Sequence, residues 1–400
     1  MFRRPISLSA TDIGEDEHLL VQEVLRSGRL SNGPMLDRFE RAFAERFGAR
    51  HAIGVSSGTA ALHLSILAAG VHDGDMVITT PFSFIATANP ILYERAIPVF
   101  VDVDPQTLNI DPATAIDAIE TLTSRRAGWE RLLPPRGATP TGTLRAIIPV
   151  DVFGRMAEMR DIVAAARAAG VAVIEDACEA VGASLDGIPA GRWGDAGTSA
   201  FYPNKQMTTG EGGMVLTDND VWAQVIRSLR SQGRSDDRSW LRHQRIGYNY
   251  RLDELSAAVG LAQFRRLDEL LQKRDAVAAM YAERLRGIDG ITPLAPPRPG
   301  MNLSWFVYPI RVENGLDRDS LAANLASRGV TTRPYFWPIH LQPPYRERFG
   351  FDRGDYPHSE AAGDSLLALP FHGSLTEDEV DYVCASIADA VAERAASNYK

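Results

Sequence analysis

The first two-thirds of the chain alternate short apolar runs with longer amphipathic stretches. Apolar positions recur at helical spacing in stretches such as 59–70 and 156–170, and Gly170 marks the end of the second. Strands that alternate with helices are typical of a mainly parallel sheet covered by helices. The pattern therefore predicts a large α/β domain built on a seven-stranded sheet. The apolar runs that we assign to its strands are 51–55, 75–80, 97–103, 144–150, 171–176, 197–202 and 213–217.

Residues 253–287 form one long helical pattern that interrupts this alternation. We expect this helix to run away from the sheet and to lead into a smaller C-terminal α/β domain, which ends in a helix over 376–395. The prediction divides the chain into residues 1–252, an N-terminal segment with the large domain, and residues 253–400, the connecting helix with the small domain. The segment 123–145 is rich in Pro, Gly and Arg, and it predicts a long surface loop away from the carboxyl ends of the strands.

Charge and cysteine content narrow the class of protein. The 400 residues include 42 basic and 51 acidic side chains, a formal net charge of −9, which argues against a general nucleic-acid or membrane-surface binder. An anionic ligand must then be held by a local site. The two cysteines, Cys178 and Cys384, form neither a disulfide framework nor a zinc-ligand spacing, and no apolar run approaches a membrane span. These features predict a cytoplasmic protein without a bound metal.

Candidate chemistry gathers at the expected strand ends, where ligands bind in open α/β sheets. After the strand 51–55, Ser57, Gly58 and Thr59 lead directly into a helix. The backbone N–H groups and the dipole of such a helix N-terminus suit a phosphate group, and Thr59 adds a hydroxyl. An ordinary Ser/Thr helix cap explains the same residues, so this alternative stays open.

Two further strand ends carry an acid and an aromatic side chain. Glu175 and Asp176 end the strand 171–176, where a carboxylate is largely desolvated and needs a cationic or hydrogen-bonding partner, such as a protonated pyridine nitrogen. A helix cap or a protein salt bridge is the alternative. Phe82 and Phe84 follow another strand and offer a face that can stack on a flat ring, or else they belong to the core.

Lys205 is the only basic residue in the stretch 199–217, where it stands between an aromatic-rich strand and a glycine cluster. It is either a surface lysine on a turn or a nucleophile held in a pocket. A phosphate cradle, a buried acid, an aromatic face and an isolated amine are together the parts needed to hold pyridoxal phosphate. In this hypothesis Lys205 forms a Schiff base with the cofactor, and Asp176 pairs with the ring nitrogen.

Five motifs occur in one order along the chain, namely "SSGTAALHL", "TPFSFIATANP", "VIEDACEAVGA", "FYPNKQMTTGEGGMV" and "GYNYRLDELSAAVGLAQ". Their order and spacing resemble the DegT-type sugar aminotransferase family, a branch of the fold-type I pyridoxal phosphate enzymes, over nearly the whole chain. The layout is most similar to members that aminate C4 of nucleotide-linked 4-keto-6-deoxyhexoses. The resemblance implies an enzyme that moves an amino group from L-glutamate to such a sugar nucleotide, through a pyridoxamine phosphate intermediate, in polysaccharide or deoxyamino-sugar biosynthesis.

The resemblance implies a role for each matching position around the cofactor ring. Lys205 would be the attachment point, and Asp176 would be the partner of the pyridine nitrogen. Phe84 would stack on the ring, while Glu179 would lie near the phenolic oxygen. An intact lysine also argues against the dehydratase branch of the family, in which histidine replaces it.

The resemblance divides the phosphate contacts between two subunits. Gly58 and Thr59 would bind the phosphate of their own cofactor. Asn249 and Arg251 would reach the phosphate of the neighbouring subunit's cofactor, which implies a homodimer with shared active sites. Members usually carry a serine at the position of Ala200, so one phosphate contact is expected to be missing.

Contacts to the sugar nucleotide are expected from loops near both ends of the chain. The side chains that we assign to the substrate are Ser31, Asn32, Arg333, Trp337 and His340. Each has a plain structural alternative: His340 lies beside prolines and can simply be packed, and Arg333 can pair with a surface acid. Asp151 stands where typical members have histidine, which changes the contacts at that strand end.

Two other functions are compatible with the same cofactor residues. A cyclitol (inosose) aminotransferase of aminoglycoside biosynthesis would share every cofactor contact and differ in its keto substrate. A non-catalytic regulatory member would keep only the scaffold. The intact Lys205 and Asp176 argue against this second alternative, as does the lack of a basic recognition helix.

Overall fold

The sheet predicted from the apolar runs forms the centre of the computed structural model, which describes residues 5–235 and 242–397. All seven runs become strands of one sheet. β9 is antiparallel to both of its neighbours and the other pairs are parallel, so the sheet is mainly parallel, as predicted. In their spatial order the strands are β1 (His51–Val55), β9 (Gly213–Thr217), β8 (Ala196–Ala200), β5 (Ala172–Asp176), β4 (Leu144–Ile147), β2 (Met76–Thr79) and β3 (Ile97–Phe100).

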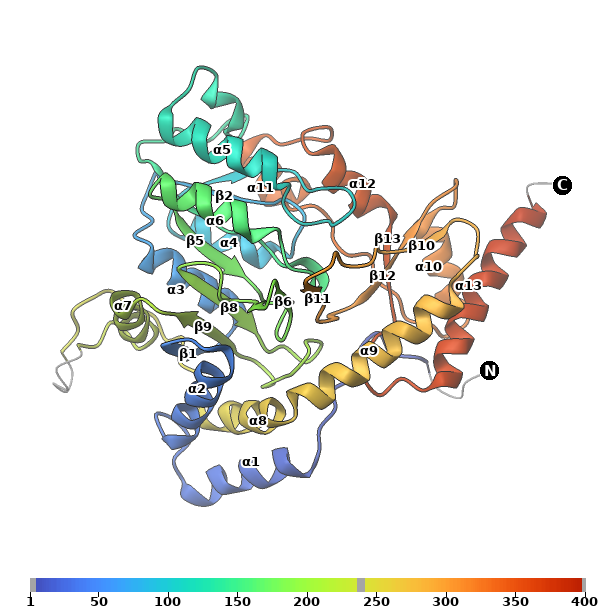
Figure 1. Cartoon of the computed structure of the whole chain (residues 1–400), viewed down its shortest axis with the longest axis horizontal. Helices are drawn as coiled ribbons and strands as arrows, with labels where there is room; N and C mark the ends of the chain where they lie inside the picture. The colour runs from blue at the N-terminus through green and yellow to red at the C-terminus, as the bar shows by residue number, and fades with distance from the viewer. Residues whose placement is uncertain (1–4, 236–241, 398–400) are drawn as a thin grey trace.

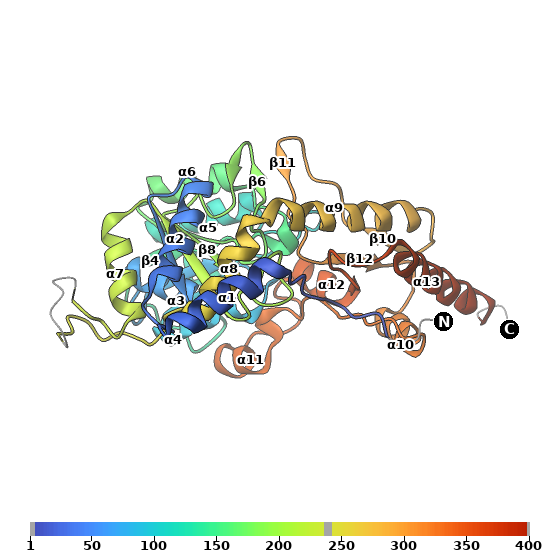
Figure 2. The ribbon, with the colours of Figure 1, turned by 90° about the horizontal axis from the view of Figure 1, so that it is seen from below.

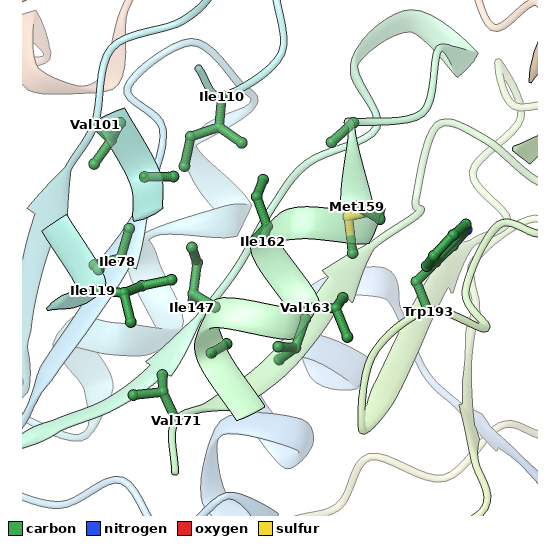
Figure 3. Packing of buried hydrophobic residues seen from close by; sticks show 14 of the residues in the cluster. Ile78, Val101, Ile110, Ile119, Ile147, Met159, Ile162, Val163, Val171 and Trp193 are labelled. Atoms are coloured by element: carbon green, nitrogen blue, oxygen red, sulfur yellow. The ribbon is translucent and has the colours of Figure 1, made fainter. Parts of the chain in front are cut away.

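Helices cover both faces of this sheet (Figure 1). Successive side chains of a strand point to opposite faces, so the neighbours Val77 and Ile78 of β2 enter different apolar clusters. Ile78 packs in one cluster with Ile147 and Ile162 (Figure 3), while Val77 packs in the other with Leu62. The covering helices are α5 (Pro112–Ser124) and α6 (Met159–Ala168) on one face, and α3 (Gly58–Ala68), α4 (Asn89–Tyr93) and α7 (Asp220–Arg230) on the other.

An aromatic cluster closes the β1 end of the sheet. Phe43 of α2 (Pro34–Phe47) stacks on Phe264 of α8 (Glu254–Arg265) with ring centroids 4.8 Å apart, and Phe39 and Phe201 join them. Helix α1 (Glu15–Ser27) packs along α8 on the outside of this cluster (Figure 2). Each of these rings buries a large apolar surface, so the cluster fixes α8 against the sheet.

The long helical pattern after Asp253 is bent into two consecutive helices. α8 ends at Arg265 and α9 (Leu267–Arg284) follows directly, with Arg266 between them in a non-helical conformation. The Arg266 guanidinium pairs with Glu17 at 3.0 Å and with Asp12 at 2.9 Å. These ion pairs hold the bend against the N-terminal segment. In Figure 1, α9 then runs away from the large sheet, as the sequence predicts.

The C-terminal part of the chain builds a second, smaller layer. Its sheet is antiparallel and consists of β10 (Ile291–Pro293), β12 (Tyr308–Val312) and β13 (Leu366–Leu369), and α10 (Arg318–Ser327) and α13 (Glu377–Ser397) pack beside it. The N-terminal segment reaches the same layer, because Ile6 bridges to Val330. Conversely, β11 (Met301–Asn302) joins the hairpin of β6 (Ser184–Leu185) and β7 (Ile188–Pro189) in the large layer. The division of the chain at residue 253 stays a prediction.

The predicted surface loop at 123–145 packs on the C-terminal part of the chain. It contains a short 3₁₀ helix, η2 (Trp129–Leu132), and its Arg136 N donates to Phe349 O at 2.8 Å, at the end of α11 (Pro343–Phe349). α12 (Pro357–Ser365) follows α11. In the part of the chain that the structure describes, no helix is both long enough and apolar enough to cross a membrane.

Candidate active site

A cavity of about 450 Å³ opens where β1, β2, β5 and β8 end. These strands all end at the same edge of the sheet, so the segments that follow them converge there. Six of the residues predicted to contact the cofactor line this one cavity, although they come from four separate parts of the sequence. They are Gly58, Thr59, Phe84, Asp176, Glu179 and Lys205.

One end of the cavity is the N-terminus of α3. Ser57 is the N-cap and its Oγ accepts from Ala60 N at 3.1 Å, which leaves the N–H groups of Gly58 and Thr59 on the cavity side. A Cβ on Gly58 would come within 2.7 Å of the Ala200 Cβ, so glycine is required at this position. The structure combines both interpretations of the motif, because Ser57 caps the helix and the next two residues line a hollow suited to an anion.

Asp176 is the last residue of β5 and is 3% exposed. Its two oxygens have separate donors: Thr87 Oγ1 donates to Oδ2 at 2.7 Å, and Cys178 N donates to Oδ1 at 3.2 Å. The Thr87 hydroxyl is itself linked to Ser83 Oγ at 2.8 Å. This network fixes the direction of the carboxylate at the cavity wall. A cationic ring nitrogen would be a suitable partner for an acid held in this way.

Lys205 follows β8 (Ala196–Ala200) and lines the same cavity. Its Nζ is 3.5 Å from Glu179 Oε1 and 3.8 Å from the centroid of the Phe306 ring. Glu179 Oε2 in turn accepts from Phe153 N at 2.9 Å. Burial raises the pKa of Glu179, and the charge of Lys205 opposes that shift. The lysine is therefore enclosed between one acid and one aromatic face, and it is not a surface lysine on a turn.

Arg274 of α9 holds the Lys205 segment in place, and the sequence analysis did not identify it. Its Nη2 donates to Lys205 O at 2.7 Å, and its Nη1 donates to Phe306 O at 3.1 Å. The guanidinium thus ties together the two neighbouring segments that carry Lys205 and Phe306. Burial lowers the pKa of Arg274 to about 10. Its helical position in an amphipathic pattern looks like that of any partly exposed arginine, so only the packing reveals this role.

The two phenylalanines after β2 have different environments. Phe84 is 60% exposed and lines the cavity, where its ring is available for stacking. Phe82 is fully buried and packs edge-on against Phe153 and Phe336. Both alternatives for this segment therefore apply, one to each side chain: Phe84 lies at the site, and Phe82 belongs to the core.

Asn249 and Arg251 lie outside this cavity, in the segment before α8. Asn249 forms a backbone bridge with Ser231, and Arg251 Nη1 donates to Gln232 Oε1 at 2.7 Å. Burial, followed by the nearby positive charges of Arg234 and Arg230, lowers the pKa of Arg251. Neither residue is therefore positioned to contact a cofactor in the cavity of its own chain.

The residues assigned to the sugar nucleotide do not form one cluster. Ser31 and Asn32 are exposed between α1 and α2. Arg333 is exposed and pairs through its backbone with Ala368. Trp337 is 66% exposed and lines an open hollow together with Arg136 of the 123–145 loop. Trp337 directly follows Tyr335 and Phe336 in the sequence, and these two residues line the main cavity. The hollow and the cavity are therefore connected by one continuous segment.

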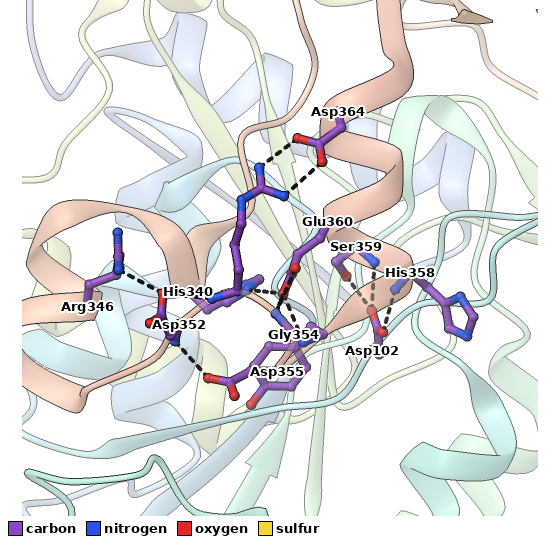
Figure 4. Close-up of polar contacts among 12 residues, drawn as sticks. Asp102, His340, Arg346, Asp352, Gly354, Asp355, His358, Ser359, Glu360 and Asp364 are labelled. Atoms are coloured by element: carbon purple, nitrogen blue, oxygen red, sulfur yellow. Dashed lines mark hydrogen bonds and ion pairs between the residues drawn. The ribbon is translucent and has the colours of Figure 1, made fainter. Parts of the chain in front are cut away.

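The expectation that His340 contacts the substrate does not fit its environment. His340 is 0% exposed, and its Nε2 lies 3.0 Å from Glu360 Oε1 (Figure 4). Burial lowers the pKa of His340, while the Glu360 carboxylate opposes this shift. Glu360 also accepts from Gly354 N and Tyr356 N, at 2.9 Å and 3.2 Å. His340 therefore belongs to a buried polar network, where it presents no surface to a ligand.

The cavity residues fit pyridoxal phosphate. The hollow at α3 is too tight for a side chain at residue 58 and presents backbone N–H groups, as a phosphate requires. Asp176 and Lys205 provide an oriented acid for the ring nitrogen and an enclosed amine for the aldehyde. Ala200 lines the hollow next to Gly58 with a methyl group, so the hydroxyl usual at that position is absent from this wall.

The chain is similar to known proteins over almost its full length. It matches the model of the DegT/DnrJ/EryC1/StrS aminotransferase family over residues 11–388. It is 37% identical over 386 residues to GDP-perosamine synthase from Caulobacter vibrioides, an alignment that covers 96% of this chain and 97% of that protein. It is also 37% identical over 373 residues to a pleiotropic regulatory protein from Geobacillus stearothermophilus, with 92% and 93% of the two chains covered.

Solved structures agree with this similarity. The crystal structure of a DegT DnrJ EryC1 StrS aminotransferase from Brucella abortus superposes with a TM-score of 0.81 at 32% identity, over 93% of this chain and 94% of that one. The fold and the site therefore define a pyridoxal phosphate-dependent sugar aminotransferase. The chain belongs to the DegT/DnrJ/EryC1/StrS aminotransferase family.

Proposed function

We propose that the protein moves an amino group from L-glutamate to C4 of a nucleotide-linked 4-keto-6-deoxyhexose, in polysaccharide or deoxyamino-sugar biosynthesis. The observation that carries this proposal is the position of Lys205, whose Nζ lies between Glu179 and Phe306 in the cavity that Asp176 also lines. The similarity to GDP-perosamine synthase supports a nucleotide-linked amino sugar as the product.

Pyridoxal phosphate, when bound, supplies an aldehyde that links to amines and a ring that withdraws electrons from the linked carbon. The protein's own residues supply the binding and the proton transfers. Lys205 Nζ would take the proton from Cα of glutamate and pass it to the bound cofactor, and in the second half-reaction it would carry a proton from the cofactor to C4 of the sugar. Asp176 would keep the ring nitrogen protonated, and Phe84 would cover one face of the ring.

We also propose that the active unit is a homodimer in which Asn249 and Arg251 of one subunit reach the phosphate of the other subunit's cofactor. Their position outside the cavity of their own chain supports this arrangement. A cytoplasmic location is part of the proposal, and the free thiols of Cys178 and Cys384 support it.

The substrate contacts that we retain in the proposal are those with exposed side chains. Ser31, Asn32, Arg333 and Trp337 can each reach a ligand from solvent, whereas His340 cannot. Trp337 offers an aromatic face beside the segment that lines the main cavity, so it is placed to contact a sugar or a base.

The proposal is tested by an amino-transfer assay with purified protein, pyridoxal phosphate and L-glutamate. A GDP-linked 4-keto-6-deoxyhexose is the first acceptor, with UDP-linked and dTDP-linked analogues and a keto-cyclitol in parallel. We expect 2-oxoglutarate and an aminated sugar nucleotide to form together, with mass spectrometry to identify the product. Lys205→Ala should lose about 10²-fold to 10⁴-fold in rate, since it removes the proton-transferring amine.

Each outcome of this assay has one meaning. Transfer to the keto-cyclitol alone would replace the proposal with a cyclitol aminotransferase. Binding of pyridoxal phosphate without conversion by glutamate would favour a regulatory protein. Equal rates for the wild type and Lys205→Ala would remove Lys205 from its proposed role.

A further inference from the structure

Two carboxyl groups lie buried against each other behind the cavity wall. Asp151 follows β4, and Glu175 is the residue before Asp176 in β5. Both are 0% exposed. Neither lines the cavity that holds Lys205 and Asp176. Two buried acids in contact are costly unless a proton or a cation separates them, so the pair requires an explanation.

The hydrogen bonds of this pair leave one oxygen of each acid without a donor. Asp151 Oδ1 accepts from Ala157 N at 2.9 Å, and Glu175 Oε2 accepts from Trp193 N at 2.9 Å. The other two oxygens, Asp151 Oδ2 and Glu175 Oε1, have no donor among the described residues. Glu175 acts on the pKa of Asp151 both through its charge and through a side-chain hydrogen bond, so the two side chains are neighbours. Two carboxyl groups can form that bond only if one of them keeps its proton.

The surroundings indicate which acid carries the proton. Burial, and next the charge of Glu175, raise the pKa of Asp151 well above its ordinary value, and the charge of Asp176 acts in the same direction. Burial also raises the pKa of Glu175, but the N–H groups of Gly191 and Trp193 and the charge of Arg192 oppose this shift. The proton therefore belongs to Asp151, and Glu175 accepts it as the anion.

The same pair is connected to both acids of the cavity. Asp151 N donates to Asp176 O at 3.0 Å, so the two backbones are joined directly. Asp151 also begins the turn η3 (Val152–Gly154), in which Phe153 has a φ of 59°. This unusual conformation directs Phe153 N to Glu179 Oε2 at 2.9 Å. A displacement of Asp151 therefore moves Asp176 through their backbone hydrogen bond, and it moves Glu179 through the η3 turn.

We propose that Asp151 and Glu175 share a single proton in the folded protein, and that this proton locks the turn that positions Asp176 and Glu179 at the cavity. Asp151 is in this sense a positioning residue. The shared proton itself does not depend on the function proposed above, whereas its effect on the cavity rests on that function.

The first test detects the proton in the protein without cofactor. Infrared spectra of the wild type should contain a carbonyl band of a protonated carboxylic acid that disappears in Asp151→Asn. The amide of this variant keeps a donor for Glu175 and lacks the acid. Asp161→Asn, which alters an exposed acid on α6, is the matched control and should keep the band. An unchanged band in Asp151→Asn would overturn the shared proton.

The second test uses the pH dependence of unfolding. The folded protein keeps a proton on Asp151 that the unfolded chain loses above its ordinary pKa of 3.8. In this pH range the folded state binds more protons than the unfolded chain. The free energy of unfolding therefore falls as the pH rises from 3.8 towards the raised pKa that Asp151 has in the folded state. The unfolding constant of the wild type should rise relative to Asp151→Asn by up to about tenfold per pH unit in this window. Parallel profiles for the two proteins would contradict the proposal.

The third test separates a positioning role from simple packing. Binding of pyridoxal phosphate is measured at neutral and at alkaline pH for the wild type, Asp151→Asn and Asp151→Val. We expect Asp151→Asn to bind like the wild type at neutral pH and to lose less affinity at alkaline pH, because it has no proton to release. Asp151→Val leaves Glu175 Oε1 without a donor and should bind pyridoxal phosphate at least about tenfold more weakly.

These outcomes distinguish the two proposals. If Asp151→Asn and Asp151→Val weaken binding equally at every pH, the lock on the cavity is wrong. If the infrared and unfolding results hold but the wild type does not bind pyridoxal phosphate, the proposed function fails and the shared proton stands.

Discussion

The cofactor end of the cavity and its outer rim are built in opposite ways. At the cofactor end, Asp176 and Glu179 are buried, and each is held by donors from elsewhere in the chain. At the rim, Trp337 is 66% exposed, and Arg333 is exposed as well. The first region is fixed by the sheet and the second follows loops.

This difference reflects what each region has to do. Proton transfer requires groups held within a fraction of an ångström of the productive geometry, and only a packed scaffold provides that precision. Recognition of a sugar nucleotide can tolerate adjustable contacts, and loops provide these at little cost to the fold. Substitutions at the cofactor end should therefore have large effects on turnover, while those at the rim should change affinity alone.

Apart from Lys205→Ala, the largest effect is expected from Arg274→Met at the cofactor end. This change removes the guanidinium that joins Lys205 O to Phe306 O, so the lysine segment can shift relative to the Phe306 segment. A displacement of about 1 Å costs roughly 100-fold in rate, and we expect a loss of that size in kcat. Steady-state kinetics with glutamate and the acceptor measure it.

Arg265→Met is the matched control, because Arg265 is exposed at the end of α8 and carries the same charge. It should leave kcat unchanged. Circular dichroism establishes whether Arg274→Met is folded, and reduction with borohydride followed by mass spectrometry tests whether Lys205 still reacts with the cofactor. A folded Arg274→Met enzyme with normal kcat would show that the lysine segment needs no such clamp.

A smaller effect is expected at the rim from Trp337→Ala. Loss of an aromatic contact is worth about 0.5–1.5 kcal/mol, so KM for the sugar nucleotide should rise by about twofold to tenfold. The reaction with glutamate alone should be unaffected, and thermal unfolding should change little because the ring is already exposed. A fall in kcat without a change in KM would place Trp337 with the cofactor end.

An effect of similar size, but a gain, is expected from Ala200→Ser at the phosphate hollow. The new hydroxyl can donate to the phosphate from the wall beside Gly58, and a net hydrogen bond is worth about 0.5–1.5 kcal/mol. The Kd for pyridoxal phosphate should therefore fall by about twofold to tenfold in a titration. Ser199→Ala, on the opposite face of the same strand, is the control and should leave this Kd unchanged. Weaker binding by Ala200→Ser would show that the methyl group fits the hollow better.

The seven strands and most of the cofactor side could be predicted because they depend on local and periodic signals. A short apolar run between helical stretches identifies a strand whatever its partners are, and the strand ends then indicate where ligands gather. Lys205, Asp176 and the Gly58 turn could be identified in this way. The alternatives for Ser57, Phe82 and Phe84 could not be resolved, since each choice depends on which side of the strand end faces the cavity.

What the sequence could not show arises from contacts between distant segments. His340 looks accessible beside its prolines, and only packing against Glu360 shows that it is buried. Arg274 looks like a helix-surface arginine until α9 brings it under the Lys205 and Phe306 carbonyls. Local sequence alone identifies the isolated Lys205, the turn at Gly58 and the acid Asp176 at a strand end. The enclosure of that lysine, and the proton that Asp151 keeps, depend on burial, which exists only once the chain has packed.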